Sequence, residues 1–295
     1  MSYLVAHWSY DPFLIVALLV AAWHEIGLRS LALRSRPERA RERRLRSVWF
    51  YAGLAVLLLT VMSPVDYWSS SYFWVHMIQH LLLSFAAPTL IVAGAPWAPL
   101  MDALPARLGA RLVRRVALDR WAGPLRVAGR AVAQPWVAVV AFNAVMIAWH
   151  VPVLYDLAER NEAVHIWLMH GSLFVTGVLF WLQFIASPPA RVRLRPAAQI
   201  AALTGTNVAM WFLAMSMSIF TTVSWYPVYA HVAGVTLPPF ADQQIGAAIL
   251  WVCGDFWCYP AVGLIIRRMI DRDGASATVD RLLRGRRSRY RWAGR

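Results

Sequence analysis

Long apolar runs separated by short polar segments dominate the chain. Five of these runs are uncharged and long enough for a membrane helix, which needs roughly 20 apolar residues to cross about 30 Å of hydrocarbon. They lie at 47–65, 67–101, 131–155, 163–190 and 196–241. Two further runs, 12–28 and 243–266, each contain a single acid, Glu25 or Asp255. We therefore predict an all-α polytopic membrane bundle within residues 1–268, with seven transmembrane helices. The predicted spans are about 12–28, 47–64, 71–94, 135–157, 163–186, 197–222 and 242–266.

The basic residues, all arginine, predict the orientation of the chain in the membrane. All but Arg160 lie in four segments, at 29–46, 107–130, 191–195 and 267–295. These segments alternate with connections that carry acids, and short cytoplasmic loops hold the excess of arginine in membrane proteins. We expect the N-terminus outside, the C-terminus in the cytoplasm, and a multi-pass protein of the bacterial inner membrane.

Three of the segments outside the predicted spans, an inner loop, the basic tail and the N-terminus, allow further predictions. Leu108, Leu112 and Val116 recur at four-residue spacing among arginines, which predicts a helix on the membrane surface. The tail over 269–295 is interpreted as a cytoplasmic topology signal that attracts anionic membrane lipids, with no role in nucleic-acid binding. The first eleven residues lack the basic segment of a signal peptide, so we expect the first span to stay as an anchor.

Composition narrows the class of protein further. With 59% hydrophobic and 15% charged residues, the chain offers no soluble catalytic domain, and we expect no enzyme activity. A net charge of +14 would suggest nucleic acid in a soluble chain, but here the arginines flank apolar runs. Cys253 and Cys258 lie in one apolar run without CxxC spacing, so they indicate neither a disulfide framework nor a zinc site.

Five histidines within the predicted spans carry the most informative chemistry. Ionisable groups inside a membrane are costly and normally face a partner, a cavity or an ion. Counting about 1.5 Å per residue from the predicted span ends places all five in the outer half of the bilayer. They are His76, His80, His150, His165 and His170.

Residues four apart share one face of a helix, which adds methionines to this layer. The pairs with this spacing are His76/His80, Met146/His150 and His165/Met169. Imidazole together with thioether favours copper, preferably Cu(I), whereas hard ions would need carboxylates, which we expect this layer to lack. The pattern predicts a copper site, against the alternative that the histidines only join helices and the methionines only fill space.

A few other polar residues are candidates for function. Glu25 and Asp255 fall at similar depths in the inner half, where they could share a proton or pair with an arginine, and a structural ion pair is the favoured interpretation. Asp242, Gln243 and Gln244 open the last predicted span. An acid at a helix N-terminus is stabilising, so capping explains Asp242 without a ligand role.

Several short motifs occur in order over most of residues 47–260. They are Ser63-Pro64, His76-Met77-Ile78-Gln79-His80-Leu81-Leu82, Ala87-Pro88, Trp149-His150-Val151-Pro152, Val164-His165 and Asp242-Gln243-Gln244. Together they resemble the signature of the CtaG family of multi-span cytochrome c oxidase assembly factors. The resemblance implies an accessory protein that delivers or positions copper for a haem-copper oxidase, with oxidase subunits and a periplasmic copper donor as partners. His165 and His170 are five residues apart, roughly 140° on an ideal helix, so we expect only His170 to ligate.

Three other functions fit the same residues. A haem-binding membrane electron carrier would use two histidines from different helices as iron ligands. A copper or proton transporter would use Glu25 and Asp255 as an inner exit path. In a purely structural scaffold, the histidines would only hold helices together.

Overall fold

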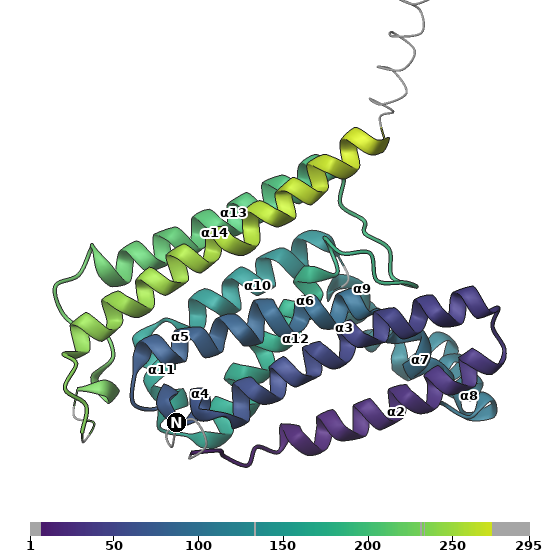
Figure 1. Ribbon diagram of the computed structural model, residues 1–295, viewed down its shortest axis with the longest axis horizontal. Coiled ribbons are helices and arrows are strands. Elements are labelled where there is room, and N and C mark those ends of the chain that lie inside the picture. The colour runs from purple at the N-terminus through teal and green to yellow at the C-terminus, as the bar shows by residue number, and fades with distance from the viewer. Residues whose placement is uncertain (1–6, 133, 231, 233, 273–295) are drawn as a thin grey trace, which may run out of the picture.

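The computed structural model describes residues 7–132, 134–230, 232 and 234–272 (Figure 1). Within these ranges the chain forms helices and loops, with one isolated β-bridge between Ser187 and Ala190. Six of the described helical segments are long and apolar enough to cross a membrane. They are Phe13–Leu33 (α2), Pro37–Met62 (α3), Phe73–Gly94, Val164–Trp181, Pro196–Ser218 (α13) and Pro239–Asp271 within α14 (Pro239–Arg272). The all-α, multi-pass character is therefore confirmed.

The fourth predicted span is the incomplete one. Helix α10 (Pro135–Trp149) has 15 residues, which at 1.5 Å per residue is about 22 Å, short of the roughly 30 Å hydrocarbon core. It reaches spanning length only together with Arg120–Ala131, from which it is bent by 79°. The span was predicted to run to residue 157, but proline lacks the N–H that would continue the helix, and Pro152 begins a separate helix, α11 (Pro152–Glu159). The described chain thus has six candidate spans, or seven if the bent pair counts as one. The orientation of the termini stays a prediction.

Two spans are longer than their apolar runs. α3 begins at Pro37, ten residues before the predicted start, because Pro37 suits the first helical turn and Arg46 pairs with Glu42 at 2.8 Å one turn apart. α14 has 34 residues and includes the start of the predicted basic tail, 269–272. The rest of that tail, 273–295, lies outside the described residues.

The helices form an elongated bundle with short helices at its ends (Figure 1). α13 and α14 run along one edge and α2 along the opposite edge, with α10 and the two composite spans between them. α4 (Pro64–Ser69) and α11 lie at one end. At the other end lie α7 (Trp97–Asp102), α8 (Ala106–Leu118) and α9 (Gly123–Val132). α8 confirms that the predicted surface segment is helical. The short turns η2 (Arg120–Ala122) and η4 (Pro227–Tyr229) complete the described helices.

Both composite spans contain a π-helix next to histidines. The first span consists of α5 (Phe73–Leu81), the π-helix η1 (Leu82–Ala86) and α6 (Ala87–Gly94). The second consists of the π-helix η3 (Val164–His170) and α12 (Gly171–Trp181). π-helices are rare and occur frequently at functional sites.

Two glycines allow other helices to approach these spans closely. A Cβ atom on Gly177 of α12 would lie 2.5 Å from the main-chain oxygen of Ser84 in η1. A Cβ atom on Gly246 of α14 would lie 2.5 Å from the ring of Phe73, at the start of α5. Because neither contact leaves room for a methyl group, these glycines set how closely α12 and α14 pack around the histidine-bearing span.

Candidate metal centre

Four of the predicted histidines form two pairs of touching rings. His76 and His80, one turn apart on α5, bring their Nε2 atoms to 2.7 Å. His165 and His170 of η3 bring theirs to 2.9 Å. The ring centroids of His76 and His165 are 5.2 Å apart, so the two pairs adjoin. Helices α5 and η3 therefore deliver four imidazoles to one cluster, in which His76, His80 and His170 are at most 1% exposed.

The π-helix explains why His165 and His170 meet. An ideal α-helix would separate residues five apart by roughly 140°, whereas a π-helix forms i→i+5 hydrogen bonds and brings such residues onto one face. The expectation that the five-residue interval would turn these rings apart is therefore wrong. Both rings are available to the cluster, and the side chain of His165 is 16% exposed.

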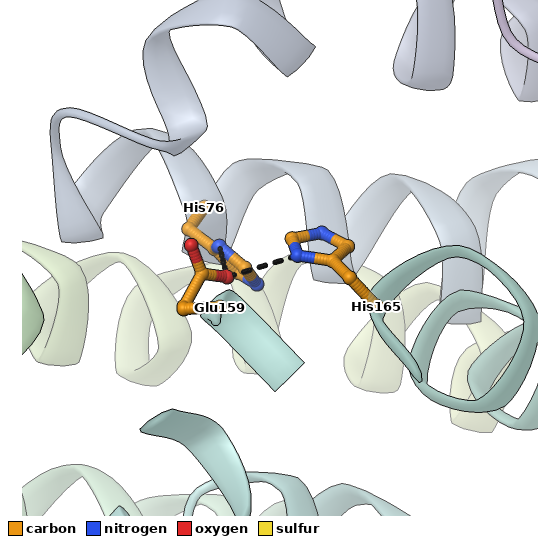
Figure 2. Close-up of side chains that lie close together, drawn as sticks. All are labelled: His76, Glu159 and His165. Atoms are coloured by element: carbon orange, nitrogen blue, oxygen red, sulfur yellow. Dashed lines mark ion pairs between the residues drawn. The ribbon is translucent and has the colours of Figure 1, made fainter. Parts of the chain in front are cut away.

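A carboxylate joins this cluster. Glu159, the last residue of α11, places Oε1 3.3 Å from Nδ1 of His76 and 3.1 Å from Nδ1 of His165 (Figure 2). Its side chain is only 5% exposed, and Oε1 meets hydrogen-bond geometry with neither ring. One oxygen and two nitrogens thus face one another within 4.8 Å, an arrangement that could hold a metal ion. The expectation that this layer lacks a carboxylate is wrong.

His150 extends the cluster from a third helix. Its ring centroid is 5.7 Å from that of His80. Its Nδ1 lies 2.6 Å from the main-chain oxygen of Met146, which can only accept, so Nδ1 carries the proton. In a neutral ring Nε2 then presents a lone pair, and it lies 3.2 Å from Sδ of Met77. A nitrogen and a thioether sulfur face each other here with no proton between them, and a soft cation would satisfy both.

The methionine sulfurs that contact the histidine rings are only partly those that the four-residue spacing predicts. Met169 is buried, but its Sδ lies 3.4 Å from Nε2 of His80 on the facing span. Met77, which that spacing did not single out, provides the sulfur beside His150. Met146 is also fully buried and contacts His150 through its main-chain oxygen. Its thioether as a ligand stays a prediction.

Comparison with known protein families identifies the family to which the chain belongs. A family model described as "Cytochrome c oxidase caa3 assembly factor" matches residues 26–272. The chain belongs to this family. The match confirms the resemblance drawn from the motifs and includes every residue of the cluster.

The chain is also similar to mycobacterial proteins. Uncharacterized proteins of Mycobacterium bovis and Mycobacterium tuberculosis are each 27% identical over 207 residues, which is 70% of this chain. The matched part is 31% of those proteins, so the chain spans about a third of the length of the curated relatives it matches. No solved structure matches the chain.

Buried tyrosines contact the histidine cluster. Tyr229 donates its hydroxyl to the main-chain oxygen of Ser69 at 2.9 Å, and that hydroxyl lies 3.4 Å from Nδ1 of His76. The hydroxyl of Tyr155 is 2.6 Å from that of Tyr229. Tyr226 donates to the main-chain oxygen of His150 at 3.0 Å. Buried tyrosines thus hold both ends of the histidine cluster.

The family motif Asp242-Gln243-Gln244 has a bracing role in the structure. Both carboxylate oxygens of Asp242 accept from the free N–H groups that begin α5, Phe73 at 2.8 Å and Trp74 at 3.0 Å. The acid therefore caps the neighbouring helix, one turn before His76. Gln243 accepts from Trp225 N at 2.6 Å and donates to the oxygen of Met217 at 2.7 Å, and Gln244 donates to the oxygen of Ser218 at 3.3 Å. These contacts fasten the loop that follows α13.

Gln79, inside the His76–His80 motif, has a similar role. It is fully buried and donates to Oδ1 of Asp66 at 2.8 Å and to the main-chain oxygen of Thr60 at 3.2 Å. Asp66 lies in α4, outside the spans. Burial raises the pKa of this carboxyl, against the lowering effect of hydrogen bonds from Ser9 and Gln79.

The two acids of the inner half have separate partners. Glu25 accepts from Arg29 at 2.6 Å and from the hydroxyl of Tyr51 at 3.0 Å. Asp255 accepts from Asn207 at 2.9 Å. Helices α2 and α14, which carry them, lie at opposite edges of the bundle (Figure 1). The structure therefore bears out the ion pair for Glu25 and gives Asp255 an amide partner.

Glu159 is a candidate ligand that the sequence patterns did not predict. It stands in a polar turn beside Arg160, where an acid is normally solvated. Its four-residue spacing from Tyr155 could have indicated its burial, because this spacing places both side chains on one face of α11. Tyr155 is fully buried, so that face points into the protein.

Proposed function

We propose that this chain binds copper in the histidine cluster and passes it to a haem-copper oxidase during assembly. Membership of the assembly-factor family supports the oxidase as recipient, and it supports a place in the bacterial inner membrane. The contact between His150 Nε2 and Met77 Sδ at 3.2 Å carries the choice of metal. Two unprotonated donors, one of them a thioether, suit Cu(I) better than hard cations or a hydrogen bond.

The ligands change character across the cluster. Glu159 and the Nδ1 atoms of His76 and His165 offer one oxygen and two nitrogens. The Nε2 atoms of His76 and His80 follow, and the thioethers of Met169 and Met77 lie beyond them. Oxygen ligands favour harder ions and thioethers favour Cu(I), so the thioether end would retain the reduced ion best.

Exposure supports a direction for this path. The side chain of His165 is 16% exposed, whereas His150 is 1% exposed. Copper from a periplasmic donor would enter beside Glu159 and His165 and move inward toward His150. His76 and His80 each have neighbours on both sides, so the ion could change ligands one at a time rather than lose all of them together.

A haem carrier has less support from this geometry. A porphyrin needs an open slot on the ligating side of a histidine. Here the Nε2 atoms of both pairs point at each other within 2.9 Å. We expect the purified protein to lack a Soret band.

Copper titration with sulfur-specific spectroscopy tests the proposal. The protein purified in detergent would be loaded with Cu(I) against a competing chelator, and X-ray absorption would detect copper–sulfur scattering. Met77→Leu should lower the affinity and reduce that scattering. Met210→Leu is the matched control, because Met210 is equally buried and lies in the apolar core. Leucine replaces methionine with little cost to folding.

Two results would overturn the proposal. One is copper bound without sulfur scattering in the wild type together with unchanged affinity in Met77→Leu. The other is full copper content in an oxidase matured with His80→Ala and His170→Ala in place of the wild-type chain. A His24→Ala chain is the control for that experiment, since His24 is a fully buried histidine on α2 that contacts Tyr51.

A further inference from the structure

An apolar groove lies beside the π-helix η1. Its volume is about 560 Å³. Leu82 and Phe85 of η1 line it together with Trp181 of α12 and Phe256 and Trp257 of α14. It contains no acidic residue among the described residues that line it, and its one charged residue is Arg268 at the end of α14.

A second cavity adjoins the groove at that arginine. Its volume is about 700 Å³, and it is formed by the loop after α12 and the end of α14. Arg191 and Arg268 line it with Gln199, and again the described lining holds no acid. Ile265 and Arg268 belong to both cavities. A long apolar groove therefore continues into a chamber whose charges are two guanidinium groups.

The dimensions of the combined site match one leaflet of a bilayer. From Cys253 to Arg268, the groove follows α14 for about 22 Å at 1.5 Å per residue. One leaflet comprises roughly 15 Å of hydrocarbon and a further 5–7 Å of headgroup. The two arginines lie on the side that the charge distribution predicts to be cytoplasmic, where anionic lipid headgroups attract arginine.

We propose that the two cavities together bind one anionic phospholipid. An acyl chain lies in the groove against η1, and the phosphate lies between Arg191 and Arg268. Arg268 is held beside the groove, since its Nη1 donates at 3.4 Å to the main-chain oxygen of Phe184, which also lines the groove. The acyl chain would pack against Leu81 and Leu82, directly after His80, and so would support the π-helix from the lipid side.

Native mass spectrometry of the whole chain, stripped of lipid in detergent, tests this site. Phosphatidylglycerol and phosphatidylcholine with identical acyl chains would be added in separate titrations. The wild type should bind one phosphatidylglycerol preferentially. The double variant Arg191→Gln with Arg268→Gln should lose roughly 30-fold in affinity, because each arginine near an anionic headgroup contributes roughly fivefold.

Arg267→Gln is the matched control. Arg267 neighbours Arg268 in sequence, but its side chain is 79% exposed and it lies 4.0 Å from Asp271. This variant should bind phosphatidylglycerol like the wild type. Equal binding of the two lipids by the wild type, or an equal loss in Arg267→Gln, would overturn the proposal in favour of non-specific attraction.

Competition and unfolding measurements distinguish a bound lipid from a free anion and from a general loss of stability. Inorganic phosphate at millimolar concentration should fail to displace the lipid; full displacement would point to a free-anion site and overturn the proposal. Thermal unfolding in phosphatidylcholine should be alike for wild type and double variant, so that a loss of phosphatidylglycerol binding reflects the two arginines.

The apolar part of the site has a test of its own. Filling the groove with Ala261→Phe should weaken phosphatidylglycerol binding, because Ala261 lines the groove away from the headgroup. Unchanged binding in that variant would count against the site.

Discussion

The carboxylate of Glu159 offers the sharpest test of the proposed metal centre. Its Oε1 lies 3.3 and 3.1 Å from the Nδ1 atoms of two histidines, so it can act as a ligand or orient both rings. Glu159→Gln keeps the shape of the side chain and removes its charge. Loss of a group that orients metal-binding histidines typically costs 10- to 100-fold in metal affinity, or about 1.4–2.8 kcal/mol.

Coulomb energy indicates the same order or more. A unit negative charge about 4 Å from a unit positive ion contributes roughly 4 kcal/mol at an effective dielectric constant of 20. Part of this is offset by the cost of burying the carboxylate in the protein without metal. We therefore expect Glu159→Gln to weaken copper binding by about 10- to 100-fold.

The assay is competition for Cu(I) with a chromogenic chelator at fixed pH, with thermal unfolding of the metal-free protein measured in parallel. Glu162→Gln is the control, because Glu162 is an exposed acid three residues further along the same polar turn. An affinity for Glu159→Gln within twofold of the wild type would contradict a role of Glu159 in metal binding. So would an equal loss in Glu162→Gln, since the effect would then be the net charge of the turn.

Three other predictions follow from the packing, the capping and the charge pattern. Gly177→Ala should lower the free energy of unfolding by about 1–3 kcal/mol, because its methyl group would overlap the main chain of η1. Gly205→Ala, where a methyl group meets nothing within 4 Å, should leave that energy unchanged or higher in the same denaturation experiment. Asp242→Ala should lower the free energy of unfolding by about 0.5–2 kcal/mol, because it uncaps α5. It should also weaken copper binding through His76 in the same chelator competition. An unchanged copper affinity would show that the cap does not contribute to the site. In a cysteine-free background, an impermeant thiol reagent should label Asn161→Cys and spare Leu33→Cys in intact cells, and the reverse would invert the predicted orientation.

The spans were predictable because their physical cause is local in sequence. A bilayer requires a certain number of apolar residues, and that number can be counted along the chain. α10 is the exception, because its 15-residue length depends on a proline break and on a bend before Pro135. The contact of His76 with His80 was equally predictable, since four-residue spacing on an α-helix is enough to bring them together.

The rest of the site depends on contacts between segments far apart in sequence. Met77 meets His150 across 73 positions, and Met169 meets His80 across 89. The spacing of residues along a helix cannot predict such pairs, because it relates only residues of the same helix. The π-helix at His165 could not be predicted for a related reason. The same apolar residues occur in α-helices and in π-helices, so the sequence pattern does not distinguish them, and packing in the folded protein selects between them.

The two π-helices also link the histidine cluster to the rest of the bundle. η3 turns His165 and His170 onto one face, and η1 begins two residues after His80, where Ser84 donates to the oxygen of His80 at 2.5 Å. Gly177 places α12 directly against η1, since a Cβ atom there would lie 2.5 Å from the main-chain oxygen of Ser84. α-Helical winding over Val164–His170 would turn His165 and His170 roughly 140° apart and break the contact between their rings. Copper exchange among these ligands therefore requires that the π-helix η3 be kept, with each ring moving by rotation of its own side chain.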